Sequence, residues 1–204
     1  MKYFCIDTSG ALTAVGAVGE RKVYRADDGF VRASRALMPM IDSVLAEAGL
    51  KPSKADFIGV VIGPGSFTGI RIGVSTARAL SYALDIPIVP VNSCELAAYN
   101  SRCSGKVLTV SDAGNGFVYT ATYEDMKELS APSCIRAGDL DAYRAKVSPD
   151  AIAADDMYAK ILNVEPTRGD GLIGLCGELF DSRHCAYSEA VPLYVRRSQA
   201  EEGT

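Results

Sequence analysis

The sequence has few of the side chains that most often perform metal or acid–base chemistry. Its 204 residues contain no tryptophan and a single histidine, His184. One histidine excludes a metal site built from several imidazoles and leaves one candidate for a histidine general base. Because His184 stands between Arg183 and Cys185 in a polar stretch, we expect it to be an exposed surface residue.

The cysteines also lack a pattern that would mark a disulfide frame or a zinc site. The six of them are scattered from Cys5 to Cys185, and no Cys-x-x-Cys pair occurs. In a reducing cytosol such isolated thiols stay reduced, so we expect ordinary core or surface cysteines.

Two further absences limit where the protein acts and what it binds. No apolar run approaches the roughly 20 residues that span a membrane, and Asp7 interrupts the amino terminus too early for a signal peptide. A cytoplasmic protein is expected.

Basic residues are not in excess either, since the net charge is −4 and the pI is about 5.1. An acidic chain binds phosphates poorly, so any link to RNA should pass through a partner.

The remaining composition is that of an ordinary globular protein, with 48% hydrophobic and 23% charged residues. A chain of 204 residues can form one large domain or two lobes with a sizeable core. The small polar stretch at 100–105 is the best linker candidate. We therefore predict an amino-terminal lobe over 1–102 and a smaller carboxy-terminal lobe over 103–204.

The chain is organised around residues 57–84. Residues 57–62 form a short β-branched run without charge, which predicts a strand buried on both faces. Residues 63–69 read Gly-Pro-Gly-Ser-Phe-Thr-Gly and break that pattern with residues that permit unusual backbone angles. From residue 70 to 84 the spacing of apolar residues is helical. The unit is therefore a strand, a tight loop and a helix.

The predicted helix has two distinct faces. One face is almost free of side chains, because small residues recur at every fourth position, at Gly69, Gly73 and Ala77. Another backbone could approach closely there. A polar stripe lies on a different face and consists of Arg71, Ser75, Arg78 and Tyr82.

The glycine-rich loop does not match the common phosphate-binding motifs. A P-loop needs Lys after its last glycine, whereas Ile70 and Arg71 follow Gly69. A dinucleotide fingerprint needs a third glycine where Thr68 stands, and a nucleophile elbow needs glycines in place of Pro64 and Thr68. We therefore favour a tight strand-to-helix connection over a nucleotide site.

The segments around this unit predict a mixed sheet covered by helices. Pro39 lies inside one helical pattern, so that helix either begins near Pro39 or kinks there. In chain order the expected elements are strands at 2–6, 12–18, 22–25 and 86–91 and helices at 37–48 and 94–100.

The second half of the chain repeats the start weakly. A strand at 106–111, a turn at 112–116 and a strand at 117–123 are expected. Asp7 and Asp112 each follow a strand and open a turn, which indicates an internal duplication. Further short elements are expected, namely helices at 139–147, 157–162 and 172–180 and a strand at 151–154.

The sequence at 63–73, followed by Thr76-Ala77-Arg78-Ala79-Leu80, resembles the signature of the TsaB (YeaZ) family, and residues 192–201 resemble its tail. The resemblance extends over nearly the whole chain. It implies an α/β protein with the two-lobed fold of actin and Hsp70, in which mixed, ribonuclease-H-like sheets are flanked by helices.

The family resemblance also implies a function. Members are non-catalytic relatives and partners of TsaD in forming threonylcarbamoyladenosine next to the tRNA anticodon. TsaD would hold the metal and substrate, a TsaE-type ATPase would bind the assembly, and tRNA would be reached only through the complex. No catalytic, metal-binding or cofactor-binding residue is expected in this chain. It departs from the family pattern at Ala33, Ser34 and Arg35, where a His-Ser-Glu-like start is common, and at Gly114 and Phe117.

We expect the partner surface on the helices at 37–48 and 70–84, because the small-residue face of the second helix would let another helix approach. When the TsaD-type partner is missing, a homodimer should use the same face. The residues expected at this surface are Gly69, Arg71, Ile72, Gly73, Thr76, Ala77, Leu80, Ile41 and Leu45.

Two other functions compete with this interpretation. The first is an ATP-binding phosphotransferase or ATPase of the actin and Hsp70 group, with Asp7 and Asp112 near metal and phosphates. It would need a glycine pair against adenosine in the second lobe, and Gly171 and Gly174 are an unconvincing match. The second is a peptidase, which the single histidine and the missing nucleophile elbow make least favoured.

Overall fold

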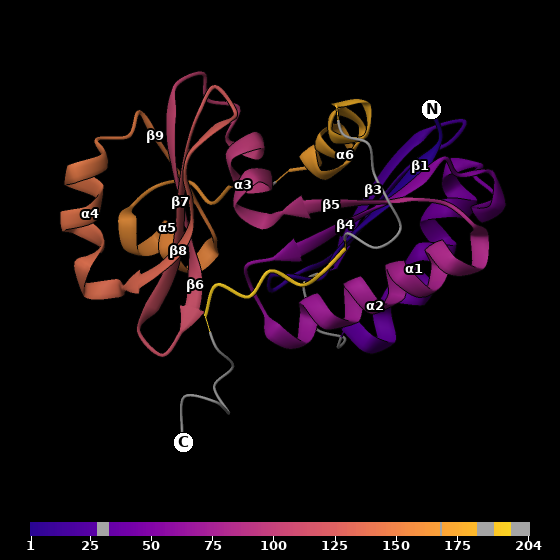
Figure 1. Cartoon of the computed structure of the whole chain (residues 1–204), viewed down its shortest axis with the longest axis horizontal. Helices are drawn as coiled ribbons and strands as arrows, with labels where there is room; N and C mark the ends of the chain where they lie inside the picture. Colours follow the sequence, from indigo (N-terminus) through magenta and orange to yellow (C-terminus); the bar gives the residue numbers. More distant parts are fainter. Residues whose placement is uncertain (28–32, 168, 183–189, 197–204) are drawn as a thin grey trace. The chain divides into compact units, whose positions relative to one another are not determined.

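The computed structural model of the chain describes residues 1–27, 33–167, 169–182 and 190–196. The chain forms two compact units (Figure 1). The first unit contains Met1–Asn92 and Asp170–Leu193, and the second contains Ser93–Gly169 and the chain from Tyr194 onward. This division differs from the predicted one, which placed all of 1–102 in one lobe and all of 103–204 in the other.

The first unit is built on a five-stranded mixed sheet with the order β3-β2-β1-β4-β5. β1, β2 and β3 are antiparallel neighbours, while β4 and β5 run parallel to β1. This is the ribonuclease-H-like arrangement, so the predicted fold class is confirmed. The strands are β1 (Tyr3–Asp7), β2 (Thr13–Val18), β3 (Lys22–Asp27), β4 (Phe57–Gly63) and β5 (Ile88–Asn92).

Helices cover both faces of the first sheet (Figure 1). On one face lie α1 (Ala33–Ala48) and α2 (Phe67–Leu84), and on the other lies α6 (Gly171–Ser182). Side chains alternate along β1, so that Phe4 and Ile6 join the core beneath α1 and α2, whereas the Tyr3 hydroxyl donates to the Ile173 carbonyl of α6. The first core is therefore a layer of helix, sheet and helix.

α6 packs closely on the sheet of the first unit, although the two are far apart in the sequence. A Cβ on Gly16 would overlap Ile173, and a Cβ on Gly59 would overlap Cys176, so both strands need glycine where the helix crosses them. The Phe57 ring stacks between Tyr3 at 4.4 Å and Phe180 at 4.3 Å. These contacts are far apart in sequence, and helical periodicity alone could not reveal them.

The second unit repeats the order of the first in a four-stranded sheet, β8-β7-β6-β9. β6, β7 and β8 are antiparallel neighbours and β9 is parallel to β6. This matches the arrangement of β3, β2, β1 and β4 and supports the predicted duplication. The strands are β6 (Lys106–Gly114), β7 (Phe117–Glu124), β8 (Lys127–Arg136) and β9 (Ala151–Ala154).

Helices also cover both faces of the second sheet. Cys94 and Ala98 of α3 pack with Val107 and Ala121, which explains why the second unit begins at Ser93. α4 and α5 pack on the opposite face, where Leu108 and Val118 lie. The helices are α3 (Ser93–Ser101), α4 (Leu140–Val147) and α5 (Asp156–Leu162), with short 3₁₀ turns at Pro52–Lys54 and Ala137–Asp139. Within the described ranges, no helix has the length and apolar character needed to cross a membrane.

Candidate functional site

The glycine-rich loop and the first turn lie together at the carboxyl ends of strands β1 and β4 of the first sheet. β1 ends at Asp7 and its parallel neighbour β4 ends at Gly63, so the chain leaves both strands on the same side. The Ser66 amide donates to the Ser9 carbonyl at 2.7 Å. The Thr8 hydroxyl donates to the Gly69 carbonyl at 2.6 Å. The loop is therefore bound to the turn of its own chain.

Glycine is required in the loop because the turn leaves no room for side chains. A Cβ on Gly69 would overlap the Thr8 carbonyl oxygen, and a Cβ on Gly73 would overlap the Thr8 hydroxyl. At Gly65 a Cβ would overlap the Ser9 carbonyl oxygen. The close backbone approach that the small-residue face predicts does occur. It is made by the chain's own turn, which corrects our expectation that a partner helix would use this face.

The other residues of the predicted partner surface divide into two groups. Ala77, Ile41 and Leu45 are buried in the core of the first unit, with Leu45 only 3% exposed. Ile72 and Leu80 are half-buried and pack against that same core. The residues of the predicted set that reach the surface are Arg71, Ile72, Thr76 and Leu80.

α2 begins earlier than its apolar spacing predicts. Ser66 is the N-cap residue, and its hydroxyl accepts a hydrogen bond from the Gly69 amide at 3.2 Å. The Arg71 guanidinium carbon lies 3.8 Å from the centroid of the Phe67 ring. Such a contact combines cation–π attraction with flat stacking, so it orients an arginine that is otherwise exposed.

Asp7 faces into the turn. Its Oδ1 atom accepts hydrogen bonds from the Ser9 amide at 2.8 Å and from the Ser9 hydroxyl at 2.7 Å. Burial raises the pKa of the Asp7 carboxyl above its usual value, and the bonds from Ser9 oppose that shift only in part. The sequence indicated the turn but gave no sign that Thr8 and Ser9 would contact the glycine-rich loop.

Asp112, the second predicted turn residue, lies in the second unit. It is exposed and lies within β6, and the turn itself is formed by Asn115 and Gly116, whose φ angles are 53° and 74°. The Asp112 amide donates to an Asp155 carboxylate oxygen at 2.6 Å. The Asp112 carboxylate accepts from the Gly114 amide at 3.0 Å. Its hydrogen bonds therefore shape this end of β6.

The tail residue Arg196 contacts the positions where the chain departs from the family pattern. Its Nη1 donates to the carbonyls of Ala113 at 3.2 Å and Gly114 at 2.9 Å. Its guanidinium carbon lies 4.1 Å from the centroid of the Phe117 ring. Phe117 thus provides an aromatic face for Arg196. The tail residues from 197 onward lie outside the described part of the chain.

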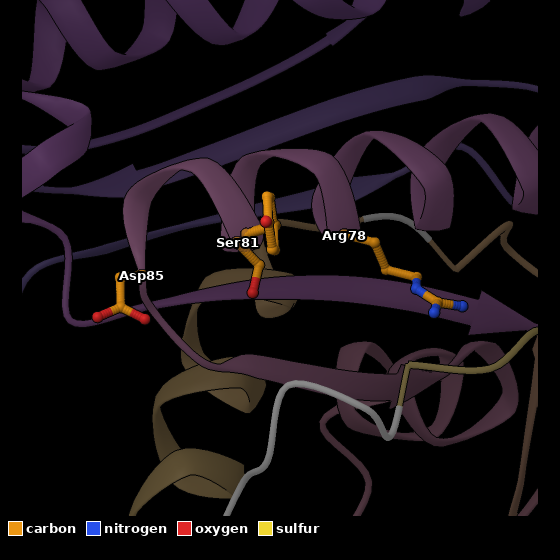
Figure 2. A pocket seen from close by; sticks show the side chains of 4 residues that line it. Arg78, Ser81 and Asp85 are labelled. Carbon is orange, nitrogen blue, oxygen red and sulfur yellow. The ribbon is translucent and has the colours of Figure 1, made fainter.

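The solvent-facing side of α2 ends in a shallow pocket of about 370 Å³ (Figure 2). We call it the Tyr82 pocket, because Tyr82 is 90% exposed beside it. Ser81 is buried and donates from its hydroxyl to the Ile86 carbonyl at 2.6 Å. Figure 2 shows Arg78 and Asp85 at opposite ends, with Ser81 between them. The described lining residues are Arg78, Ser81, Tyr82 and Asp85.

The structure lacks support for the two competing functions, the ATPase and the peptidase, in the residues that it describes. Gly171 and Gly174 lie in α6 of the first unit, whereas the ATPase hypothesis needs them in the second lobe. Among the described residues, no group of three or more His, Cys, Asp and Glu side chains is arranged to hold a metal. His184 lies outside those residues.

Comparison with known proteins identifies the relatives of this chain. The family model described as TsaD, tRNA N6-adenosine threonylcarbamoyltransferase, matches residues 31–166. The Bacillus subtilis protein named tRNA threonylcarbamoyladenosine biosynthesis protein TsaB is 35% identical over 127 residues, which are 61% of this chain. The chain belongs to the TsaB (YeaZ) family. An uncharacterised Mycobacterium bovis protein is 34% identical over 167 residues, covering 81% of this chain and 75% of that protein.

Solved structures of TsaB (YeaZ) relatives share the fold over nearly the whole chain. YeaZ from Pseudomonas aeruginosa has a TM-score of 0.77 at 22% identity and covers 95% of this chain and 99% of its own. A second structure from that organism, described as an uncharacterised protein with similarity to peptidase YEAZ, has a TM-score of 0.79 at 23% identity, with 96% and 99% covered. The sequence matches are shorter, since they span 56% of the B. subtilis protein and 39% of a Mycobacterium leprae relative.

Proposed function

We propose that this chain is a non-catalytic subunit that binds a TsaD-type enzyme and supports it in forming threonylcarbamoyladenosine next to the tRNA anticodon. The observation behind the proposal is the match to a curated protein named for threonylcarbamoyladenosine biosynthesis, together with the TsaD family model over residues 31–166. Because it acts on tRNA modification, the chain is proposed to be cytoplasmic. A TsaE-type ATPase joins the complex, and tRNA is bound through it.

The geometry of the glycine-rich loop supports a subunit role. A phosphate site at a helix N-terminus needs free amide groups. Here the Ser66 amide donates to Ser9, and the Gly69 amide donates to the Ser66 hydroxyl. The motif therefore joins β1, β4 and α2 into one rigid block. A rigid block is what a partner surface on α2 requires.

The partner surface consists of the solvent-facing sides of α1 and α2. On α2 the exposed positions include Arg71, Ser75 and Ala79, and on α1 they include Met38 at 45% exposure and Asp42. Helix α2 contains two arginines and no acidic residue. This surface is proposed to bind the TsaD-type subunit, and a second copy of the chain when that subunit is missing.

Reconstitution tests the proposal. A TsaD-type enzyme, a TsaE-type ATPase, the threonylcarbamoyl-adenylate synthase and tRNA are incubated with and without this chain, and mass spectrometry measures modified adenosine. We expect modification only when the chain is present. Equal modification without it, from partners shown to be active, contradicts the proposed function.

A matched pair of variants tests the partner surface in the same assay. Ala79→Arg places a bulky charge on the exposed side of α2, and Ala142→Arg makes the same change on the exposed side of α4. We expect Ala79→Arg to lower both the binding to the TsaD-type enzyme and the yield of modified tRNA at least about tenfold. Ala142→Arg should leave both unchanged. Equal effects of the two variants would place the surface elsewhere.

A further inference from the structure

Two arginines lie against one aromatic ring in the second unit. Phe117 of β7 and Arg136 of β8 are opposite each other in the antiparallel ladder, and the Arg136 guanidinium carbon lies 5.9 Å from the centroid of the Phe117 ring. The Arg196 guanidinium carbon lies 4.1 Å from the same centroid. We call these three residues the Phe117 patch. Its two guanidinium groups are no more than about 10 Å apart, which is the Debye length at 0.1 M salt, so their charges act together.

The Phe117 ring holds these charges without neutralising them. Its quadrupole attracts each guanidinium, but the ring has no net charge, so two positive charges remain. Arg136 is exposed, and within the described part of the chain it forms no ion pair with a carboxylate. Two like charges held close together repel each other, and an anion that binds both relieves this repulsion. The Phe117 patch therefore favours an anionic ligand.

The nearest carboxylates in this part of the second sheet are on its other face. Asp112 is opposite Val118 in the ladder of β6 and β7, so these two residues share the face that α4 and α5 cover. Asp155, the N-cap residue of α5, accepts a hydrogen bond from the Asp112 amide. Phe117 precedes Val118 and therefore shares the opposite face with Arg136. The sheet thus separates the acidic pair from the Phe117 patch.

The phosphates of an RNA backbone fit the Phe117 patch. A planar guanidinium can donate two parallel hydrogen bonds to a phosphate group, which makes arginine better suited to this contact than lysine. Arg136 is exposed, so a polymer can reach it from solvent. The chain has a net charge of −4, so one basic patch should hold RNA only weakly by itself. Its contribution is expected when the TsaD-type enzyme brings tRNA to the complex.

We propose that the Phe117 patch contacts backbone phosphates of the tRNA that the complex binds. The inference rests on the proposed function and adds to it a direct RNA contact in the second unit. Phosphate contacts position an RNA without reading its base sequence, so the patch acts on all substrate tRNAs alike. An acidic protein surface offers carboxylates in place of phosphates, and the experiment separates these two ligands.

Removal of the Arg136 charge tests the contact. Arg136 is chosen because Arg196 also donates to carbonyls of the turn between β6 and β7. Labelled tRNA is titrated with the complex of this chain and a TsaD-type enzyme at several KCl concentrations, and fluorescence anisotropy gives the Kd. For Arg136→Gln we expect an about fivefold higher Kd at physiological salt. The slope of log Kd against log salt should fall by about one. Arg136→Lys keeps the charge and should keep the slope.

Arg144→Gln is the matched control. It removes the same charge from an exposed position of the same unit, on α4, which covers the face opposite the Phe117 patch. Its Kd should stay within about twofold of wild type, with an unchanged salt slope. Circular dichroism shows whether each variant is folded. Equal losses in Arg136→Gln and Arg144→Gln, or a wild-type salt slope in Arg136→Gln, overturn the inference.

The kinetics of tRNA modification give a second readout. Arg136→Gln should raise the KM for tRNA about fivefold and leave kcat unchanged, because the lost contact is made equally in the ground state and in the transition state. Binding of the variant to the TsaD-type enzyme without tRNA should equal that of wild type. A loss of that binding would assign the patch to a protein partner and overturn the inference. If modification requires the wild-type chain and Arg136→Gln performs as well, the inference fails while the proposed function stands.

Discussion

The hydroxyl of Thr8 donates a 2.6 Å hydrogen bond to the carbonyl oxygen of Gly69, while the Thr8 carbonyl oxygen occupies the space that a Gly69 side chain would need. Both contacts lie inside the first unit, and Thr8 is only 2% exposed. The glycine-rich loop is thus packed against the first turn from two directions. Its sequence is restricted by packing within this chain.

Replacing Gly69 by alanine should destabilise the fold strongly. The new methyl group must displace backbone atoms of the Thr8 turn, so we expect the free energy of unfolding to fall by about 3 kcal/mol. Gly10→Ala is the control, because no atom lies within 4 Å of the added Cβ. Its effect should stay below about 1 kcal/mol. Urea denaturation followed by circular dichroism compares the two, and equal midpoints would contradict the packing argument.

Asp7→Asn should stabilise the protein at neutral pH and lose that advantage in acid. The folded-state pKa of Asp7 is raised above its usual 3.8 by burial, so the protonated carboxyl stabilises the fold below the unfolded pKa. That contribution is lost as the pH rises through the folded pKa. Asparagine stays neutral and can still accept from Ser9. Denaturation midpoints of both proteins from pH 3 to 8 measure the difference, and a gap that grows on acidification contradicts the sign.

Cys94 should resist thiol reagents in the folded protein. Burial raises its pKa to about 11, more than the hydrogen bonds with Thr109 and Ser93 lower it. At pH 8 about one thiol in a thousand is then ionised, and the ionised form is the one that reacts. Cys103 and Cys134 are only partly buried and should react first. Peptide mapping after iodoacetamide treatment gives the order, with urea-unfolded protein as the control. Equal labelling of Cys94 and Cys103 in native protein would count against it.

Arg196→Ala should loosen the turn between β6 and β7. The variant loses two hydrogen bonds to carbonyls and the contact with Phe117, which together stabilise this region by about 1–2 kcal/mol. Amides near Gly116 should then exchange with deuterium about tenfold faster. Arg144→Ala on the exposed side of α4 should leave that exchange unchanged. Unchanged exchange in Arg196→Ala would show that the tail contact does not hold the turn.

Elements with a strong local signal were predicted well. The uncharged run at 57–62 is β4, and the helical spacing that follows is α2. A strand buried on both faces is apolar throughout, whereas a helix buried on one face is apolar only at every third or fourth residue. The start of α2 was predicted three residues late, at 70 instead of Phe67, because capping by Ser66 depends on the loop conformation.

β8 was missed because it has little of the signal that marks a strand. Lys127 and Glu128 are exposed, and Pro132 interrupts the segment. As the edge of the second sheet it pairs with β7 alone, and edge strands tolerate charges and proline. The boundary predicted after residue 102 also differs from the structure, in which the second unit begins at Ser93. The helix α3 was predicted from the sequence, but the sequence does not show which sheet it covers.

The sequence by itself determined the fold class, the family and the presence of a small-residue face at Gly69, Gly73 and Ala77, because periods and motifs are local properties of the chain. Only the tertiary structure decided what covers that face and that α6 returns to the first sheet. A helical period shows that a face will be buried. The burying surface comes from residues distant in sequence, and its identity is fixed only when the whole core packs.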